Sequence, residues 1–172
     1  AIPPGNYKVR FSPYWGSDYV SEWYNNQQDF YSADLVGFTA GATTPNIDAT
    51  LEEGGKISGT VTSASEPTGV EGVWATAYIY NAEGGWESVG YASTDSGGAY
   101  EIGGLDTGNY RVRFAPHDST YYLSEYYNDK QTLESANDVP VTAGITTPNI
   151  DATLEEGGKI SGRVTSAAEP GG

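Results

Sequence analysis

The chain of 172 residues contains no cysteine, no methionine and only one histidine. Without cysteine there can be no disulfide bond, no cysteine-ligated metal site and no thiol nucleophile. Basic residues are also scarce: 8 Lys and Arg oppose 23 Asp and Glu, so the formal net charge is −15 at pH 7. Such a balance repels nucleic acid and anionic membrane surfaces, and we expect neither as a partner.

Long apolar runs are absent as well. No stretch approaches the ~18 apolar residues of a membrane-spanning helix, so we expect no membrane insertion in this segment. The first residues show no charged-then-apolar signal pattern, so an export signal would lie upstream or have been removed. Glycine (23) and tyrosine (14) are abundant, together with many Thr and Val. This composition, with few good helix formers in sequence, favours an all-β protein.

An internal repeat organises the chain. The stretch TTPNIDATLEEGGKISG at 43–59 recurs unchanged at 146–162. The same offset of 103 residues aligns 1–69 with 104–172 without a gap, and about 43 of these 69 paired positions are identical. We therefore treat the chain as tandem repeats, cut at the EEGG joint. This predicts one complete repeat over 55–157, the C-terminal half of a preceding repeat over 1–54, and the first strand of a following repeat over 158–172.

The complete repeat contains seven short segments with strand alternation, each bounded by turn residues. This pattern predicts a seven-stranded antiparallel Greek-key β-sandwich of Ig-like or transthyretin-like type. Several such sandwiches in series would resemble beads on a string. The stretch 121–136 lacks strand alternation, and we interpret it as a long crossover loop with at most one helical turn. Alternation places apolar residues on one face of each strand; they are Ile57 and Val61, then Val73, Ala75, Ala77 and Ile79, then the inward Tyr110, Val112 and Phe114, and last Ile150, Ala152 and Leu154.

Four motifs suggest a family: GGKISGTVTSA, GVEGVWATAYIY, STDSGGAYEIGGLDTGNYRVRF and GITTPNIDATLEEGG. Together they resemble the carboxypeptidase regulatory-like repeats, which are transthyretin-like sandwiches close to the B-type repeats of collagen-binding bacterial adhesins. The family's glycine and tyrosine pattern appears at Gly59–Val61, Thr94–Tyr100 and Gly104–Tyr110. The resemblance implies an extracellular or cell-surface location. It also implies either stacked repeats of bacterial or archaeal surface proteins or accessory modules of secreted hydrolases.

The adhesin resemblance raises the question of a self-formed isopeptide bond, which many relatives make between a Lys and an Asn beside a buried acid. Here the bond would join Lys56 to Asn149. However, Phe114 stands where the acid belongs. Glu101 is the substitute acid, and alternation with Tyr100 and Ile102 along its own strand points it outward. Without a buried acid nothing promotes the condensation, so the sequence does not favour this bond.

Catalytic motifs are missing. The sole histidine, His117, has Tyr14 at the equivalent position of the other copy, which indicates a loop residue. There is no Gly-x-Ser-x-Gly elbow, no His-Glu-x-x-His motif and no phosphate-binding glycine loop. We therefore expect no enzyme activity.

Calcium is the one cofactor with candidate ligands, because Ca²⁺ takes oxygen donors. The candidates lie in the DSGG turn and in the crossover; they are Asp95, Glu125, Asn128 and Asp129. The alternative for Asp95 is a turn residue that accepts backbone N–H bonds. For the crossover residues the alternative is a loop brace that recurs because the copies share ancestry.

Aromatic residues are dense in the crossovers and on one predicted strand face. Exposed aromatic platforms bind sugars, so candidate glycan or lateral contacts are Trp15, Trp23, Trp74, Tyr78 and Tyr80. Packing within or between repeats is the favoured alternative. The reason is that Tyr19, Trp23 and Tyr24 have aromatic equivalents at unchanged spacing in the second copy.

The joints carry the functional prediction. They consist of Glu52, Glu53, Gly54 and Gly55, and of Glu155, Glu156, Gly157 and Gly158. Joints of four residues restrict how far neighbouring repeats can swing, although a Gly-Gly hinge is the alternative. We predict a structural repeat of an extracellular fibre, stalk or surface filament that associates with itself in tandem, laterally or head to tail. The alternative is a carbohydrate-binding or accessory module of a secreted hydrolase or adhesin, with a cell-surface or glycan target.

Overall fold

The computed structural model describes residues 2–14, 16–82, 84–117 and 121–166. All regular structure within these ranges is β-strand, which confirms the predicted all-β class. The described residues accordingly include no helix long and apolar enough to cross a membrane.

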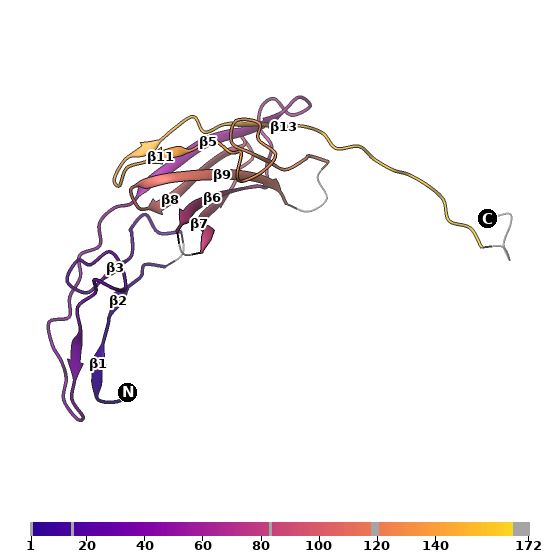
Figure 1. Cartoon of the computed structure of the whole chain (residues 1–172). Coiled ribbons are helices and arrows are strands. Elements are labelled where there is room, and N and C mark those ends of the chain that lie inside the picture. The colour runs from indigo at the N-terminus through magenta and orange to yellow at the C-terminus, as the bar shows by residue number, and fades with distance from the viewer. Residues whose placement is uncertain (1, 15, 83, 118–120, 167–172) are drawn as a thin grey trace.

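Residues 55–154 form a β-sandwich of two sheets (Figure 1). Its strands are β5 (Gly55–Ser63), β6 (Val73–Asn81), β7 (Gly85–Ser93), β8 (Ala99–Leu105), β9 (Gly108–Pro116), β10 (Glu125–Tyr126), β11 (Val139–Val141), β12 (Thr146–Thr147) and β13 (Ala152–Leu154). One sheet has the order β10-β9-β6-β7, and β11 also pairs with β9. In the other sheet β5 lies between β8 on one side and β12 and β13 on the other.

The first and last strands of the sandwich run parallel. Thr146 pairs with Lys56 and Ala152 pairs with Val61, whereas the other strand pairs of the sandwich are antiparallel. Parallel neighbours need a long connection between them, and the intervening strands of the repeat supply it. The sequence predicted antiparallel strands throughout, so this parallel pairing of β5 with β12 and β13 was not predicted.

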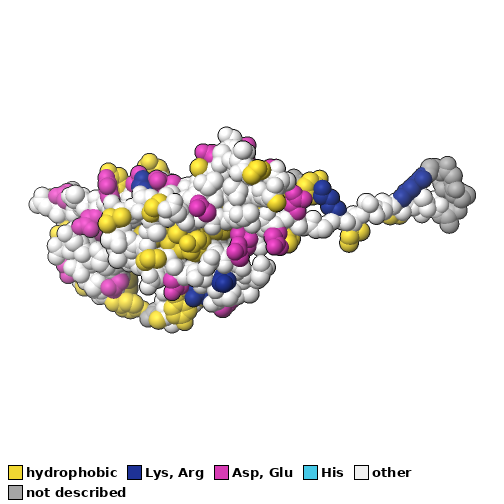
Figure 2. All heavy atoms as spheres, turned by 90° about the horizontal axis from the view of Figure 1, so that it is seen from above, with side chains coloured by type: hydrophobic (Ala, Val, Ile, Leu, Met, Phe, Trp, Pro, Cys, Tyr) yellow, Lys and Arg dark blue, Asp and Glu magenta, His cyan; other side chains and the backbone are white. Residues whose placement is uncertain are grey.

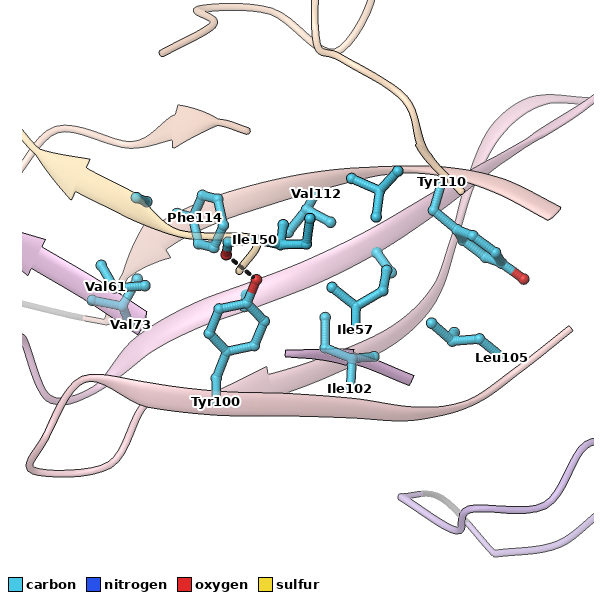
Figure 3. Close-up of a cluster of buried hydrophobic side chains, with 14 of the residues drawn as sticks. Ile57, Val61, Val73, Tyr100, Ile102, Leu105, Tyr110, Val112, Phe114 and Ile150 are labelled. Atoms are coloured by element: carbon cyan, nitrogen blue, oxygen red, sulfur yellow. Dashed lines mark hydrogen bonds between the residues drawn. The ribbon is translucent and has the colours of Figure 1, made fainter. Parts of the chain in front are cut away.

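Alternation along the strands places the core. Val73, Ala75 and Ala77 of β6 are fully buried, as are Val112 and Phe114 of β9. Figure 3 shows side chains from both sheets converging between the layers. Every buried member of this cluster belongs to residues 57–154.

Tyr100 makes a buried hydrogen bond across the core. Its hydroxyl donates a hydrogen bond of 2.6 Å to the carbonyl of Ile150, drawn as a dashed line in Figure 3. Burial raises the pKa of this hydroxyl, so it stays protonated and able to donate. The bond joins β8 to the segment that leads into β13.

The crossover between β9 and β11 contains more order than the sequence indicated. Tyr126 and Lys130 exchange two backbone hydrogen bonds, of 2.7 and 3.0 Å, which close a tight turn after β10. A further turn follows, in which the N–H groups of Ser135 and Ala136 donate to the carbonyl of Thr132 at 3.2 and 3.1 Å. The short strand β10 was not predicted.

The N-terminal part repeats the pairing of the sandwich. It contains β1 (Gly5–Tyr7), β2 (Arg10–Phe11), β3 (Glu22–Trp23) and β4 (Val36–Phe38). Gly5 pairs with Phe38 as Gly108 pairs with Val141, and Phe11 pairs with Glu22 as Phe114 pairs with Glu125. The two copies therefore share a register as well as a sequence.

Two segments of the complete repeat form strands there but not in their other copies. Residues 146–154 contain β12 and β13, whereas the matching residues 43–51 contain no strand. Residues 55–63 form β5, whereas the matching residues 158–166 contain no strand. In Figure 1 the N-terminal part and the C-terminal segment leave the sandwich in different directions. Ile57 is 0% exposed whereas Ile160, in the same sequence, is 104% exposed. A strand requires partners, and these segments have none in the described chain.

We predict that Ile57→Ala lowers the free energy of unfolding by about 2–5 kcal/mol, because it leaves a cavity in a close-packed core. The matched control is Ile160→Ala, which should leave stability unchanged because that side chain is fully exposed. Chemical denaturation followed by tryptophan fluorescence measures both. Equal losses for the two variants would contradict this assignment of the core.

Candidate functional site

The first joint is paired to the crossover of the preceding repeat. The N–H of Val20 donates to the carbonyl of Glu52 at 3.0 Å, and the N–H of Gly54 donates to the carbonyl of Asp18 at 2.7 Å. Tyr19 and Glu53 form an antiparallel bridge between these bonds. The joint is thus one side of a short ladder and not a free linker.

The second joint repeats this ladder. The N–H of Leu123 donates to the carbonyl of Glu155 at 2.8 Å, and the N–H of Gly157 donates to the carbonyl of Tyr121. Tyr122 and Glu156 form the equivalent bridge. The pairing therefore follows from residues inside one repeat and its own joint.

Close packing explains the glycines of the first joint. A Cβ at Gly54 would lie 2.6 Å from backbone atoms of Gly104 and Leu105. A Cβ at Gly55 would lie 2.3 Å from Cγ1 of Val141 and 2.5 Å from the carbonyl oxygen of Thr142. Here the Gly-Gly pair permits contact, which opposes the flexible-hinge interpretation.

The docking partner of the crossover is a second glycine pair, Gly103 and Gly104. A Cβ at Gly104, whose φ is +68°, would lie 2.5 Å from the carbonyl oxygen of Ser17. A Cβ at Gly103 would lie 2.6 Å from a carboxylate oxygen of Asp18. Sequence reasoning missed this contact, although glycines inside a strand often mark the close approach of another backbone.

Lys56 bridges the two repeats. Its Nζ lies 3.0 Å from a carboxylate oxygen of Asp18 in the preceding repeat and 2.9 Å from one of Glu101 in β8. The hydrogen bond to Glu101, followed by that to Asp18, raises the pKa of Lys56, so its charge is secure at neutral pH. At the second joint Lys159 instead lies over the ring of Tyr121, with Nζ 3.3 Å from the ring centroid.

The residues considered for an isopeptide bond make other contacts in this structure. Lys56 is engaged by two carboxylates, and its strand pairing places it opposite Thr146. Phe114 is fully buried at the position of the acid, and Glu101 is exposed, as its alternation predicted. Asn149 is exposed in a left-handed backbone conformation with φ of 64°. The arrangement supplies no buried acid for the condensation.

Three of the four candidate calcium ligands lie in tight turns. Oδ1 of Asp95 accepts the N–H groups of Gly97 and Ala99 at 2.8 and 2.9 Å. Asn128 and Asp129 have φ of 65° and 57° in the tight turn that follows β10. Among the described residues no group of three or more His, Asp or Glu side chains is placed to hold a metal ion. The calcium site stays a prediction.

Glu125, the fourth candidate, is a buried carboxyl group. It is 6% exposed, and its Oε1 has no hydrogen-bond partner in the described structure. Glu22, its equivalent in the other copy, is also 6% exposed with an unpartnered Oε1. Burial first, and then the Asp129 carboxylate, raise the pKa of Glu125 to about 7, while the N–H of Thr153 opposes the shift.

The candidate aromatic contacts are mostly engaged within the chain. Trp23 is half-buried and meets Phe30 edge-on, with ring centroids 5.4 Å apart. The ring centroid of Trp74 lies 4.9 Å from that of Tyr91 and 6.0 Å from that of His117.

The two candidate tyrosines of β6 differ in exposure. Tyr78 is half-buried, whereas Tyr80 is 60% exposed and meets Trp86 edge-on, with ring centroids 5.4 Å apart. Trp15 lies outside the described residues.

Comparison with known proteins adds only distant likenesses. No protein-family model and no curated protein matches the chain. A type II cohesin–X-dockerin complex from Acetivibrio cellulolyticus is 22% identical over 60% of this chain and 58% of that chain, with a TM-score of 0.38. The Bacillus anthracis TIE protein is 16% identical over 90% of this chain and 26% of its own, with a TM-score of 0.40.

The group B streptococcus pilus 2b backbone protein is 13% identical over 84% of this chain and 53% of its own, with a TM-score of 0.37. In each case this chain spans less than two thirds of the other protein's length. Scores and identities at this level carry no function from those proteins to this chain.

We predict that Glu125→Gln changes how stability depends on pH. A carboxyl group whose pKa is raised in the fold contributes stability that is complete below its ordinary pKa of 4.5 and is lost as the pH rises through about 7. The amide keeps the shape without the charge, so the variant should exceed the wild type in stability above pH 7. Urea unfolding across this pH range checks it. Glu134→Gln, an exposed change in the same crossover, is the control; parallel curves for wild type and Glu125→Gln would contradict the assignment.

We also predict that Gly55→Ala destabilises the sandwich by about 1–3 kcal/mol, because its Cβ would overlap Val141 and Thr142. Gly158→Ala is the matched control from the other copy, where a Cβ meets no described atom within 4 Å. Thermal unfolding measures both variants. If Gly55→Ala were neutral, the joint would be looser than this contact implies.

Proposed function

We propose that this chain is a structural repeat of an extracellular fibre, stalk or surface filament, built from β-sandwiches in tandem. The observation that carries the proposal is the ladder between crossover and joint, present at Glu52–Gly54 and again at Glu155–Gly157. A device repeated at each joint would give a tandem array a regular geometry. The stability of such an array is the sum of its units and their nearest-neighbour contacts.

Several small contributions together would hold one repeat against the next. The ladder removes backbone freedom from the joint, and the Gly103–Gly104 pair receives the crossover at close range. The Lys56 bridge is partly exposed, with 26% of its side chain accessible. Exposed ion pairs contribute only about 0–1 kcal/mol to stability. In this proposal the Lys56 bridge therefore adds little stability, and it selects the orientation of one repeat relative to the next.

The surface suits an exposed, non-catalytic module. Figure 2 shows acidic side chains spread over the visible face of the sandwich, and the net charge of −15 opposes non-specific aggregation. Basic side chains stand on the extended C-terminal segment, where Lys159 and Arg163 lie. An extracellular or cell-surface location, self-association of repeats and the absence of enzyme activity are parts of this proposal.

The test measures rigidity across the joint. The chain has no native cysteine, so Tyr31→Cys and Tyr80→Cys provide specific spin-label sites on two exposed positions, one on each side of the joint. Electron–electron dipolar spectroscopy should give a narrow distance distribution. Lys56→Gln should broaden it because both carboxylate contacts are lost, with a stability change of about 1 kcal/mol or less.

Lys159→Gln is the control, since its ammonium lies over Tyr121 at the other joint, and it should leave the distribution narrow. A broad distribution in the parent protein would contradict a fixed joint. Electron microscopy of several repeats expressed in series then extends the test. Straight, evenly beaded rods are expected, and freely bent strings would overturn the stalk.

A further inference from the structure

A cleft of about 520 Å³ lies beside the first joint. One wall is formed by residues 13, 14, 16–19 and 21 of the crossover of the preceding repeat, with Arg10. The other wall is the side of the sandwich where residues 87–91 of β7 and 101–105 of β8 lie. Ligand sites favour such interfaces between folded units and have volumes of about 300–1,000 Å³. The joint therefore forms a concavity that neither repeat makes alone.

Two of the four carboxylates that line the cleft are paired with a cation. Asp18 and Glu101 both meet the ammonium group of Lys56. Asp106 lies near the positive charge of Arg10, which opposes the effect of burial on the pKa of this carboxyl group. Glu87 is a further carboxylate of the lining, and the overall charge of −15 opposes an anionic ligand.

Aromatic and hydroxyl groups complete the lining. Tyr14, Tyr19 and Tyr91 line the cleft with 82%, 47% and 45% of their surfaces exposed. Tyr91 is held edge-on by Trp74, so its ring is oriented in advance. Ser21 and Ser88 lie on opposite walls and add hydroxyl groups. Exposed rings beside carboxylates and hydroxyls suit a ligand with both C–H faces and many hydroxyl groups.

We propose that this cleft binds a neutral oligosaccharide. The partly positive C–H groups of a sugar ring pack against the negative faces of tyrosine rings. Its hydroxyl groups both donate and accept, so they can bond carboxylates such as Glu87 and donors such as Arg10. The site differs from the strand platform of Trp74, Tyr78 and Tyr80. It is independent of fibre formation, because one joint suffices to build it.

The experiment is a titration of the ¹⁵N-labelled chain with short neutral glucan, xylan, mannan and chitin fragments up to millimolar concentration, followed by NMR. At least one fragment should shift amide signals of residues 87–91 and 101–106. Tyr91→Ala should weaken that binding about tenfold, the scale expected for losing one aromatic face. Tyr80→Ala, an exposed tyrosine on the same sheet outside the cleft, should leave it unchanged.

Unchanged thermal unfolding of Tyr91→Ala would show that any loss of binding is local. The proposal is overturned if no fragment shifts the spectrum at millimolar concentration. It is equally overturned if the shifts map around Tyr80 and Trp86, or if uronic-acid oligosaccharides bind better than neutral ones. The cleft needs the ordered joint but no fibre, so failure of several repeats to form straight rods would leave this proposal in place, and a failure to bind sugars would leave the stalk in place.

Discussion

The rest of the structure depends on the pairing of β5 with partners on both sides. β8 lies along one edge of β5, and β12 and β13 lie along the other, so the first and last strands of the repeat close one sheet. That closure buries Ile57 and Val61 against the opposite sheet. Because β5 takes its partners from strands up to 91 residues further along the chain, residues 55–154 are all needed to close this sheet.

The same strand also organises the joint. Gly55 and Lys56 are the first two residues of β5, so the strand that closes the core presents the ammonium group to Asp18 of the preceding repeat. The neighbouring β8 supplies Gly103 and Gly104, against which the crossover lies. Core closure, joint geometry and the cleft beside the joint are consequences of one strand arrangement.

Much of the sandwich was predictable because alternation reports burial directly. The inward positions of β6 and β9 and the outward position of Glu101 all followed from a period of two. The site was less predictable. Asp18 meets Lys56 across 38 positions of sequence, and Tyr121 replaces Asp18 in the other copy, so no local pattern revealed the bridge. The burial of Glu22 and Glu125 was also hidden, since both lie in crossovers without periodicity.

The sequence by itself determined the all-β class, the internal repeat with its offset and the inward faces of the strands. Only the tertiary structure decided which copies of a segment become strands. KISG is a strand at 56–59 and is extended and unpaired at 159–162, although the letters are identical. The physical reason is that a strand satisfies its backbone groups and buries its side chains through neighbours, and those neighbours lie up to a whole repeat away along the chain.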